Sequence, residues 1–516
     1  MGLKTLDIIQ KTLDAIPGIA GFDDLYRQAD IEDKKVWKYI ADKNTDGVFQ
    51  VESGMMKGII DRIQPTCFAD LGAICAIGRP GPISIGLDKK YADVKNGKEE
   101  MTYPIRGCED ILDETFGNPV YQEQLMFISK KISGFDDMQA DSITRKVLGK
   151  KKVEMFPMMK RCHVFGKKNC EGPEGWETDD NAPWYDPKGK YGKEIPGALV
   201  NGYTKEEVLD YFDKIEGFAK YCFNRAHSSC YAYIGFLTAW LKYYYPTEFM
   251  AAVLSMQDTP EDIKFYSEVC KKMDIKITVP NINISKEDFT ANAYNRTILY
   301  GLSAIKGVGG AALGELIANA PYESLENAIA RLPKKAFNKR VAEGLIKAGA
   351  FDWEDDNRIN LLNRLHEIRR DRISMDDGTK VIDYEAPDRW NENRCMAMEE
   401  ETLGTHITYH NWWEDLDDGE KATFTGRIKS VREHRQKNGK LMAFVTLTDE
   451  SIDTDIDCCV FAKQYGPLNS LLFGREGHVL RVNGKKSDKG SFIINDVQPV
   501  IKPINKMDEP EYAVDL

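Results

Sequence analysis

The sequence lacks the hydrophobic runs and the cysteine patterns that mark membrane and secreted proteins. No stretch of its 516 residues approaches the roughly 20 consecutive apolar residues that span a bilayer. The first residues carry no uninterrupted apolar block of the kind found in signal peptides. The eleven cysteines are odd in number and form no CxxC pair. We therefore expect a cytosolic protein without a membrane partner, with buried free thiols in place of disulfides.

The chain also lacks an excess of positive charge. Seventy lysines and arginines face 82 acidic residues, and the formal net charge is −12. This balance disfavours a chain that coats nucleic acid over its whole surface. Phosphate contacts are local, so the distribution of charge matters more than the total. Two basic clusters stand out, RKVLGKKK (residues 145–152) and RIKSVREHRQKNGK (residues 427–440), although a charge run is also typical of a plain solvated face.

Metal-ligand patterns are sparse. Cys162, His163 and Cys170 lie in a polar stretch and could contribute to a zinc site. A structural zinc site needs four ligands, and no fourth ligand is evident in the sequence. We therefore assign no metal site to these residues.

The chain divides into regions of different periodicity. The first region carries helical patterns interrupted by glycine and proline and contains a polar, aperiodic insertion at about 160–197. Short helical units, a charged irregular linker, a strand-rich segment and a tail follow. The predicted boundaries are 1–300 for the first helical region, 301–375 for the short helical units, 376–420 for the linker, 421–503 for the strand-rich domain and 504–516 for the tail.

The strand-rich segment predicts an OB-fold barrel. Its period changes to two from Ala422, an Asn-Gly hairpin turn follows at Asn438, and a short helix is predicted near 463–472. Five strands with a helix between the third and the fourth is the order of an OB-fold. Such barrels often bind single-stranded nucleic acid through the hairpin that joins the first two strands, and a barrel that binds an anticodon or a protein is the alternative. The candidate DNA-binding residues of this hairpin are Arg432, Arg435, Lys437 and Lys440.

The stretch LSAIKGVGGAALGELI (residues 302–317) predicts a helix, a glycine-rich turn and a second helix. Glycine lets a backbone approach a ligand closely, and the amides that open the second helix can face a phosphate. The stretch resembles the helix–hairpin–helix element, which grips the DNA backbone without reading its sequence, and residues 339–352 look like a degenerate second copy. A plain helix connector is the alternative. The candidate DNA-binding residues are Lys306, Gly307, Gly309 and Gly310.

Five further motifs occur in a fixed order before this element. In their order and their residues they resemble the fingers domain of the bacterial replicative DNA polymerase III alpha subunit, the family C polymerases. The helix–hairpin–helix pair and the barrel follow in the order of that family, so the resemblance covers nearly the whole chain. It implies a multidomain α+β protein with a mainly helical fingers domain, a helix–hairpin–helix domain and a C-terminal OB-fold β-barrel. The five motifs are GVFQVESGMM (47–56), GRPGPI (78–83), YQEQLM (121–126), ADSITRKVLGKKK (140–152) and the stretch that begins FNRAHSSCYAYIGF (223–252).

The resemblance implies a nucleotide pocket and a DNA path. The basic fingers segment is implied to face the incoming triphosphate, and the Asn-Lys-Ser-His-x-x-x-Tyr stretch is implied to line the pocket. The residues that match these nucleotide-binding segments, with one neighbouring tyrosine, are Arg145, Lys146, Lys150, Lys151, Tyr221, Asn224, Arg225, His227 and Tyr231. Arg79, from the Arg-Pro-Gly-Pro loop, and Lys152 are implied to lie near DNA.

The sequence also departs from the family pattern around this pocket. Lys220 and Cys222 stand where the family usually has glycine, and Ala226 replaces the serine before the histidine. Lys146 replaces the second arginine of an Arg-Arg pair. We therefore expect a pocket of different shape.

Phosphoryl transfer requires clustered carboxylates that hold metal ions, and the family implies three aspartates in a palm domain. No Pro-Asp-x-Asp-x-Asp motif occurs in the sequence. The nearest candidates alternate along a predicted barrel strand, where alternate side chains face one side, or lie in a predicted loop. We therefore assign no catalytic and no metal-binding residue. The rejected candidates are Asp453, Asp455, Asp457, Asp355 and Asp356.

The first apolar helix pattern starts directly after Met1 and Gly2, and Gly2 matches a family glycine that follows the third palm aspartate. The favoured hypothesis is a split alpha subunit, in which this chain is the C-terminal part lacking the palm. It would bind the incoming dNTP and primer–template DNA, and a second polypeptide would supply the palm aspartates with their Mg²⁺. The complex would be a DNA-directed DNA polymerase acting in the cytoplasm at the nucleoid, or in host cytoplasm if viral, and this chain would be inactive alone.

Two other functions are compatible with parts of the sequence. One is a non-catalytic DNA-binding protein derived from polymerase fingers, and the more distant one is an RNA-binding module of a translation enzyme. The family also implies a sliding clamp as a partner. No clamp-binding peptide of the Gln-x-Asp/Leu-Leu-Phe type occurs between residues 353 and 420.

Overall fold

The fold is known from a computed structural model. It describes residues 4–149, 153–168, 179, 181–186, 188–219, 222–373, 392–408, 416, 418–436, 439–449, 455–488 and 490–499.

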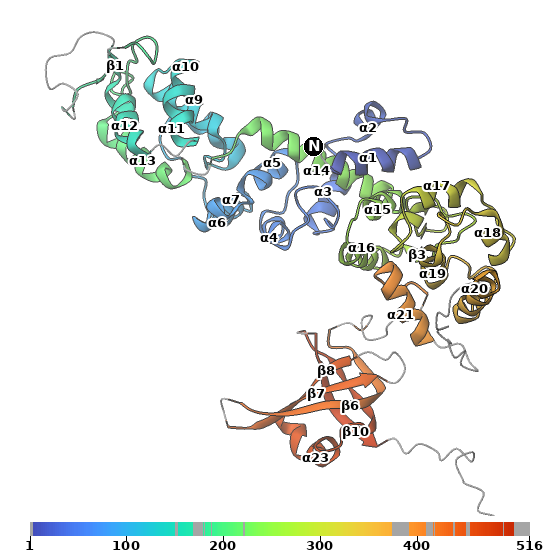
Figure 1. The fold of residues 1–516 in the computed structure, drawn as a ribbon. Coiled ribbons are helices and arrows are strands. Elements are labelled where there is room, and N and C mark those ends of the chain that lie inside the picture. The colour runs from blue at the N-terminus through green and yellow to red at the C-terminus, as the bar shows by residue number, and fades with distance from the viewer. Residues whose placement is uncertain are drawn as a thin grey trace, which may run out of the picture. The chain divides into compact units, whose positions relative to one another are not determined.

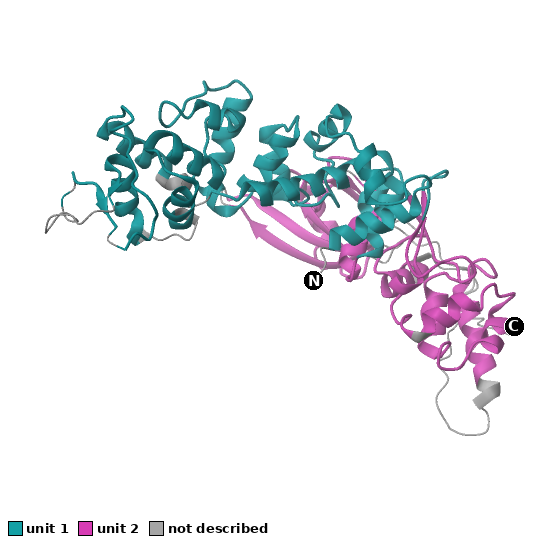
Figure 2. Ribbon diagram, turned by 90° about the horizontal axis from the view of Figure 1, so that it is seen from above, with its two compact units in different colours: residues 1–256, 268–275, 291–296 teal, residues 257–267, 276–290, 297–516 magenta. Residues whose placement is uncertain are grey.

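The chain forms two compact units (Figure 2). Unit 1 comprises residues 1–256, 268–275 and 291–296, and unit 2 comprises residues 257–267, 276–290 and 297–516. The first predicted region ended at residue 300, but residues 257–267, 276–290 and 297–300 belong to unit 2. The reason is local packing: the amide of Ile282 donates to the carbonyl of Ala350 at 3.0 Å, and the Tyr300 hydroxyl donates to the carbonyl of Leu403 at 2.9 Å.

Unit 1 is almost entirely helical (Figure 1). Its elements are α1 (Lys4–Ala15), α2 (Phe22–Gln28), α3 (Lys34–Ala41), α4 (Gly54–Ile63), α5 (Phe68–Ile77), α6 (Pro80–Ser84), α7 (Leu87–Lys95), α8 (Glu109–Leu112), η1 (Asp113–Thr115), α9 (Gln122–Ser133), α10 (Asp137–Gln139), the π-helix η2 (Ala140–Arg145), α11 (Lys146–Gly149), η3 (Val153–Met155), α12 (Phe156–Phe165), β1 (Lys167–Lys168), β2 (Trp184–Tyr185), α13 (Lys205–Ala219), α14 (Arg225–Tyr244) and α15 (Pro246–Ser255).

Two helices organise the first part of unit 1. Helix α5 is apolar all round, with Leu71, Ile74 and Ile77 fully buried, so it forms a central core helix. Helix α14 packs against it and is tied to it by Ser228, whose hydroxyl donates to the carbonyl of Gly72 at 2.6 Å. Farther along α14, the buried Lys242 ammonium donates to the carbonyls of Asn44 and Asp46, which fixes the loop before the GVFQVES motif.

A second hydrophobic core joins α9, η2, α12 and α13. It corrects the picture of the predicted insertion at 160–197. Helix α12 continues to Phe165, and Tyr191 and Ile195 from the second half of the stretch are buried in this core. The buried Lys167 ammonium donates to the carbonyl of Gly192 at 2.5 Å, which ties the stretch back on itself. The stretch is therefore partly a folded component of unit 1, although its polar composition predicted a surface excursion.

The helical part of unit 2 contains a glycine-rich hairpin between η5 and α17, further helices and a small sheet. Its elements are β3 (Lys276–Thr278), β5 (Thr297–Leu299), η5 (Leu302–Ala304), α17 (Ala311–Ala318), α18 (Leu325–Arg331), α19 (Lys339–Lys347), α20 (Arg358–Ile373) and α21 (Glu392–Leu403). Helix α16 (Pro260–Lys272) and strand β4 (Thr290–Asn292) contribute residues to both units, and the sheet order is β3-β5-β4.

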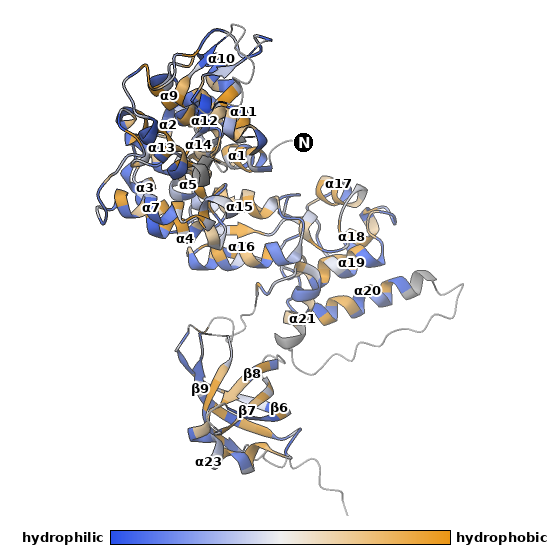
Figure 3. Cartoon of the chain, turned by 90° about the vertical axis from the view of Figure 1, so that its left-hand side faces the viewer, coloured by the Kyte–Doolittle hydropathy of each residue, from blue (hydrophilic) through white to orange (hydrophobic). Residues whose placement is uncertain are grey.

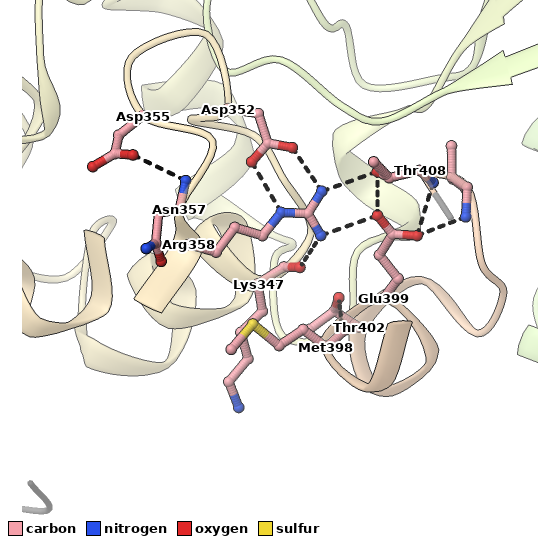
Figure 4. Close-up of polar contacts among 10 residues, drawn as sticks. Lys347, Asp352, Asp355, Asn357, Arg358, Met398, Glu399, Thr402 and Thr408 are labelled. Atoms are coloured by element: carbon pink, nitrogen blue, oxygen red, sulfur yellow. Dashed lines mark hydrogen bonds and ion pairs between the residues drawn. The ribbon is translucent and has the colours of Figure 1, made fainter. Parts of the chain in front are cut away.

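Helix α21 lies inside the predicted linker 376–420. It is held by the helical part of unit 2, because its buried Glu399 pairs with the buried Arg358 at the start of α20 (Figure 4). Its last turn contacts the glycine hairpin between η5 and α17, since the carbonyl of Thr402 accepts a hydrogen bond from the amide of Lys306 at 2.9 Å. Charged composition predicted a linker here, but the charges of Glu399 and Arg358 are internal.

The C-terminal strands form a closed barrel in the order β10-β8-β7-β6-β9. Along β6 the burial alternates through Phe424 and Ile428, and Figure 3 shows hydrophobic and hydrophilic residues along the barrel strands. Helix α23 lies in the chain between the third and fourth strands, so the predicted OB-fold order is confirmed. The elements are β6 (Lys421–Arg435), β7 (Leu441–Asp449), β8 (Asp455–Val460), α23 (Ala462–Leu472), β9 (Val479–Lys486) and β10 (Phe492–Pro499).

Two findings concern apolar helices and thiols. Within the described part of the chain, no helix is long and apolar enough to cross a membrane. The ten cysteines that the structure describes are all free, as predicted, and Cys108, Cys162 and Cys270 are among those that are fully buried.

Candidate nucleic-acid interface

The start of α14 brings together four polar side chains. Asn224 caps the helix: its Oδ1 accepts the amide of His227 at 2.9 Å, and its Nδ2 donates to Glu123 Oε1 at 2.7 Å. The backbone amide of Arg225 donates to Glu123 Oε2 at 2.9 Å, and its guanidinium pairs with Glu114 at 2.7 Å. Carboxylates thus hold Asn224 and Arg225 in fixed positions at the surface.

An aromatic column runs along the first two turns of α14. The His227 ring lies 5.2 Å from Phe223 and 4.2 Å from Tyr231, and Tyr231 contacts Phe49 at 5.2 Å. The spacing of four residues places His227 and Tyr231 on one face of α14, and Phe223 lies just before the N-cap residue Asn224. The Arg79 guanidinium lies 4.4 Å from the Phe223 ring, and partial burial lowers its pKa. Exposed rings with a cation at one end can stack bases and hold phosphate.

Arg145 and Lys146 lie where the π-helix η2 passes into α11. Both pair with the Asp141 carboxylate, Lys146 at 2.9 Å, and the hydrogen bond from Arg145 is the main cause of the lowered pKa of Asp141. Single-turn π-helices often occur at functional sites. Here the π-helix is anchored from below, because Thr144 Oγ1 lies 2.8 Å from Ser129 Oγ.

Helix α9 links these two sets of predicted nucleotide-binding residues. Glu123 in its first turn holds Asn224 and Arg225, whereas Ser129 holds the π-helix. Six residues of helix rise about 9 Å. Helix α9 therefore contacts both sets of predicted nucleotide-binding residues, those at the start of α14 and those of the π-helix. No contact among the described residues joins the two sets directly.

The glycine hairpin between η5 and α17 contains the four predicted DNA-binding residues of this region in one turn. Lys306, Gly309 and Gly310 are exposed, and open space surrounds the last two. Gly307 has φ +92°, and a Cβ there would lie 3.0 Å from Arg340 Nε on α19. The turn therefore requires glycine both for its backbone conformation and for the close approach of α19.

The barrel carries an open cavity of about 500 Å³ on its outer face. Arg432 on β6 is in register with Phe444 on β7, and its guanidinium lies 5.4 Å from that ring. His434 contacts the same ring at 5.8 Å. Arg435 donates to the carbonyl of Gly439 across the hairpin at 3.4 Å, and Lys440 is exposed beside it. A ring beside the Arg432 guanidinium suits a stacked base and its phosphate.

The carboxylates and the zinc candidates do not fit a metal. Asp455 pairs with Lys429, and Asp457 accepts from Thr446 at 3.2 Å. His163 is fully buried, with Nδ1 donating to the carbonyl of Met159 and Nε2 2.9 Å from Ser129 Oγ. Both ring nitrogens of His163 are therefore used inside the core. Among the residues with a described position, no group of three or more histidine, cysteine or acidic side chains could hold a metal ion.

Several predicted residues lie outside the described residues, so the structure does not place them. They are Lys150, Lys151, Lys152, Tyr221, Lys437, Cys170 and Asp453.

Sequence reasoning missed the partners that fix these sites. The spacing of Phe223 relative to His227 was a usable signal for a ring column. No sequence signal points to Glu114, Glu123 or Phe444, because their roles depend on contacts with residues far along the chain or on a neighbouring strand.

Two family models match the chain. Residues 5–169 match the bacterial DNA polymerase III alpha subunit finger domain, and residues 274–361 match a helix-hairpin-helix motif.

Curated relatives match over almost the whole chain. The DNA polymerase III subunit alpha of Aquifex aeolicus is 32% identical over 526 residues, covering 96% of this chain and 42% of the relative. That of Escherichia coli K12 is 32% identical over 514 residues, covering 92% of this chain and 41% of the relative. The chain thus spans about two-fifths of the length of these relatives.

A solved structure of the mitochondrial single-stranded DNA-binding protein Rim1 from S. cerevisiae matches 16% of this chain and 97% of its own. The sequence identity is 19% and the TM-score is 0.15, so this match supports no assignment. The finger-domain match, the helix-hairpin-helix match, the OB-fold order of the barrel and the relatives named above agree with one another. The chain therefore corresponds to the portion of the bacterial DNA polymerase III alpha subunit that carries the fingers, the helix–hairpin–helix region and the barrel.

Proposed function

We propose that this chain binds the incoming dNTP and primer–template DNA as part of a DNA polymerase III alpha subunit. The observation that carries the proposal is the ring column in which the exposed His227 lies between the half-buried Phe223 and Tyr231, with Arg79 at one end, on a chain similar to these polymerases over nearly its whole length. The rings would stack a base, and the fixed cations would hold phosphate oxygens.

The catalytic carboxylates are proposed to come from outside these 516 residues, on a separate polypeptide that carries the palm and its Mg²⁺. The support is chemical. Phosphoryl transfer needs clustered carboxylates, and three of the aspartates considered from the sequence, Asp455, Asp457 and Asp355, are engaged with a lysine, a hydroxyl and a backbone amide.

Arg145, Lys146 and Arg225 each have a carboxylate partner. We assign these carboxylates the task of holding the cations at the surface until a triphosphate replaces them. A triphosphate carries more negative charge than one carboxylate and offers several acceptor oxygens to a planar guanidinium.

Primer extension tests the proposal. The chain would be assayed alone and together with a palm-bearing polypeptide from the same genome, with Mg²⁺ and all four dNTPs. We expect synthesis only from the mixture, and R145A should raise the apparent KM for dNTP while leaving the affinity for primer–template unchanged. Synthesis by the chain alone would contradict the placement of the carboxylates. DNA binding without synthesis in the mixture would favour the non-catalytic DNA-binding protein.

A further inference from the structure

The connection between α3 and α4 contains a loop, residues 44–52, that lies against one face of α14. Helix α14 also packs against α3 and α5 (Figure 1). Four positions of α14 meet the loop, and their spacing of four, three and four residues is that of one stripe along a helix. A single helix face therefore shapes the loop. The four positions are Tyr231, Gly235, Thr238 and Lys242.

The buried Lys242 holds the first part of the loop. Its ammonium donates to the carbonyl of Asn44 at 3.1 Å and to that of Asp46 at 2.8 Å, and only 2% of the residue is exposed. Burial lowers the pKa of Lys242 from 10.5 to about 8, because an ammonium removed from water loses its hydration. Hydrogen bonds to the two carbonyls offset part of this cost. The Asp46 side chain is held from a second helix, since its carboxylate pairs with Lys57 on α4 at 2.5 Å.

The backbone of Phe49 holds the second part of the loop. Its amide donates to Thr238 Oγ1 at 3.1 Å. Its carbonyl oxygen lies so close to α14 that a Cβ at Gly235 would be 3.1 Å away, so the approach depends on glycine at this position. The loop is closed on itself by Glu52, whose Oε1 accepts a hydrogen bond from the amide of Gly47 at 2.9 Å. These contacts give the Phe49 ring a defined position.

The Phe49 ring meets the end of the ring column. It is half-buried and lies 5.2 Å from Tyr231, which in turn lies 4.2 Å from the exposed His227. Lys242 follows Tyr231 by eleven residues, which corresponds to roughly 16 Å along the helix axis. The 44–52 loop and Phe49 thus connect a buried ammonium to a predicted nucleotide-binding residue that it does not touch.

We propose that Lys242 is a positioning residue for nucleotide binding, which holds the 44–52 loop so that Phe49 supports Tyr231 at the end of the ring column. A ring that is already held in place can stack a base without first losing rotamer freedom. The inference rests on the proposed function and deepens it, because it assigns a role to a buried residue outside the predicted nucleotide-binding set.

The test measures the dNTP kinetics of K242M in the primer-extension mixture described above, with active sites counted in a single-turnover burst. Methionine keeps most of the side-chain length, but the carbonyls of Asn44 and Asp46 lose their donor. K242M should raise the apparent KM for dNTP roughly 10-fold, with kcat per active site changed by less than about twofold. A chain that is only destabilised would have fewer active sites and an unchanged KM. The matched control is K38Q, which removes an exposed lysine of α3 that pairs with Asp42 outside the loop and should leave KM unchanged.

Two further variants separate the path through the loop from the effect of charge. T238V removes the acceptor of the Phe49 amide but keeps the side-chain shape and the net charge, so it should raise KM in the same direction. In an F49A background, K242M should raise KM by less than about twofold more, because the ring through which Lys242 acts is gone. Hydrogen exchange on the chain alone should become faster in the 44–52 loop of K242M, with the amides of α9 as the internal reference.

Two outcomes would overturn the inference. An unchanged KM in K242M, together with faster exchange in the loop, would give Lys242 a role in stability only. Equal increases of KM on adding K242M to the wild-type and the F49A chains would show that the effect does not pass through Phe49. If K242M failed to fold, T238V would decide, since an unchanged KM there contradicts the inference and a raised KM supports it. If the mixture with the unsubstituted chain gave no synthesis, the proposed function would fall as well, whereas unchanged KM values in active variants would remove only this inference.

Discussion

Arginine–carboxylate pairs occur in two settings in this chain. At Arg358 the guanidinium and Glu399 are completely buried, and the guanidinium has protein acceptors on each side. At Arg145 and Arg225 the pairs are near the surface, with 38% and 46% of the two guanidinium side chains exposed. A buried pair cannot be broken without leaving a charge unsolvated, whereas a surface pair can exchange its partner for water or a ligand. The same chemistry thus builds structure in unit 2 and leaves cations available in unit 1.

The largest expected effect comes from breaking the buried pair. R358A should lower the free energy of unfolding of the helical part of unit 2 by about 3–5 kcal/mol, because Glu399 loses its arginine partner at a fully buried position. Hydrogen exchange of the amides in α19, α20 and α21 would measure this.

The matched control is R364A on the same helix. Arg364 pairs with Glu326 and Glu354 but is 35% exposed, so its loss should cost about 1 kcal/mol. R358M/E399L should recover only part of the stability, because it removes the buried Glu399 charge but leaves Asp352 without its arginine partner. Equal losses for R358A and R364A would show that burial does not separate the two kinds of pair.

The second-largest expected effect is a loss of stability at acidic pH caused by the buried His163. Burial lowers the pKa of His163 from 6.5 to about 4. Between pH 6.5 and pH 4 the imidazole is protonated in the unfolded chain but neutral in the native chain. The contribution of His163 to the free energy of unfolding is therefore fully present above pH 6.5 and is lost as the pH falls toward 4. The loss should reach roughly 3 kcal/mol, at 1.36 kcal/mol per pH unit.

Urea unfolding of the wild type and H163Q between pH 7 and 4 would test this. The variant should be less stable at pH 7 but flatter with pH. Parallel curves would indicate that other groups cause the acid sensitivity.

The sequence predicted much of the fold and part of the site. Periodicity and turn residues were enough for the barrel and for the hairpin at Gly307, because both depend on local pattern. The predicted linker failed at α21, since nothing local shows that Glu399 will meet Arg358 across 41 positions. The binding role of the predicted cations stays a prediction, and their carboxylate partners Asp141 and Glu114 could not be predicted because they are properties of packing. Composition gives the number of charged residues, whereas tertiary contacts decide which of those residues are buried.

His227 is expected to behave oppositely to Arg358, with little effect on stability and a large effect on binding. His227 is exposed between two rings, so H227A should change stability by less than about 0.5 kcal/mol. If the column stacks a base, the same variant should weaken nucleotide or template binding by about 1–3 kcal/mol. Binding in the complemented enzyme and thermal unfolding of the chain measure the two effects. H227F keeps a ring and is the control, and an equal loss with both variants would point to a hydrogen bond of the imidazole instead of stacking.

The smallest expected effect on stability comes from the surface pair that Asp141 makes. D141N removes the carboxylate that Arg145 and Lys146 share, and because both cations are well exposed the loss should be about 1 kcal/mol or less. The π-helix should persist, since Thr144 still contacts Ser129 below it. The freed cations should bind a triphosphate more tightly at low salt, which titration with a fluorescent dNTP analogue would detect. K130Q, which breaks the exposed pair with Asp137 and leaves the π-helix cations untouched, should change neither quantity appreciably. A loss of several kcal/mol in D141N would place this pair with Arg358 among the structural ones, and the division between the two settings would then not follow exposure.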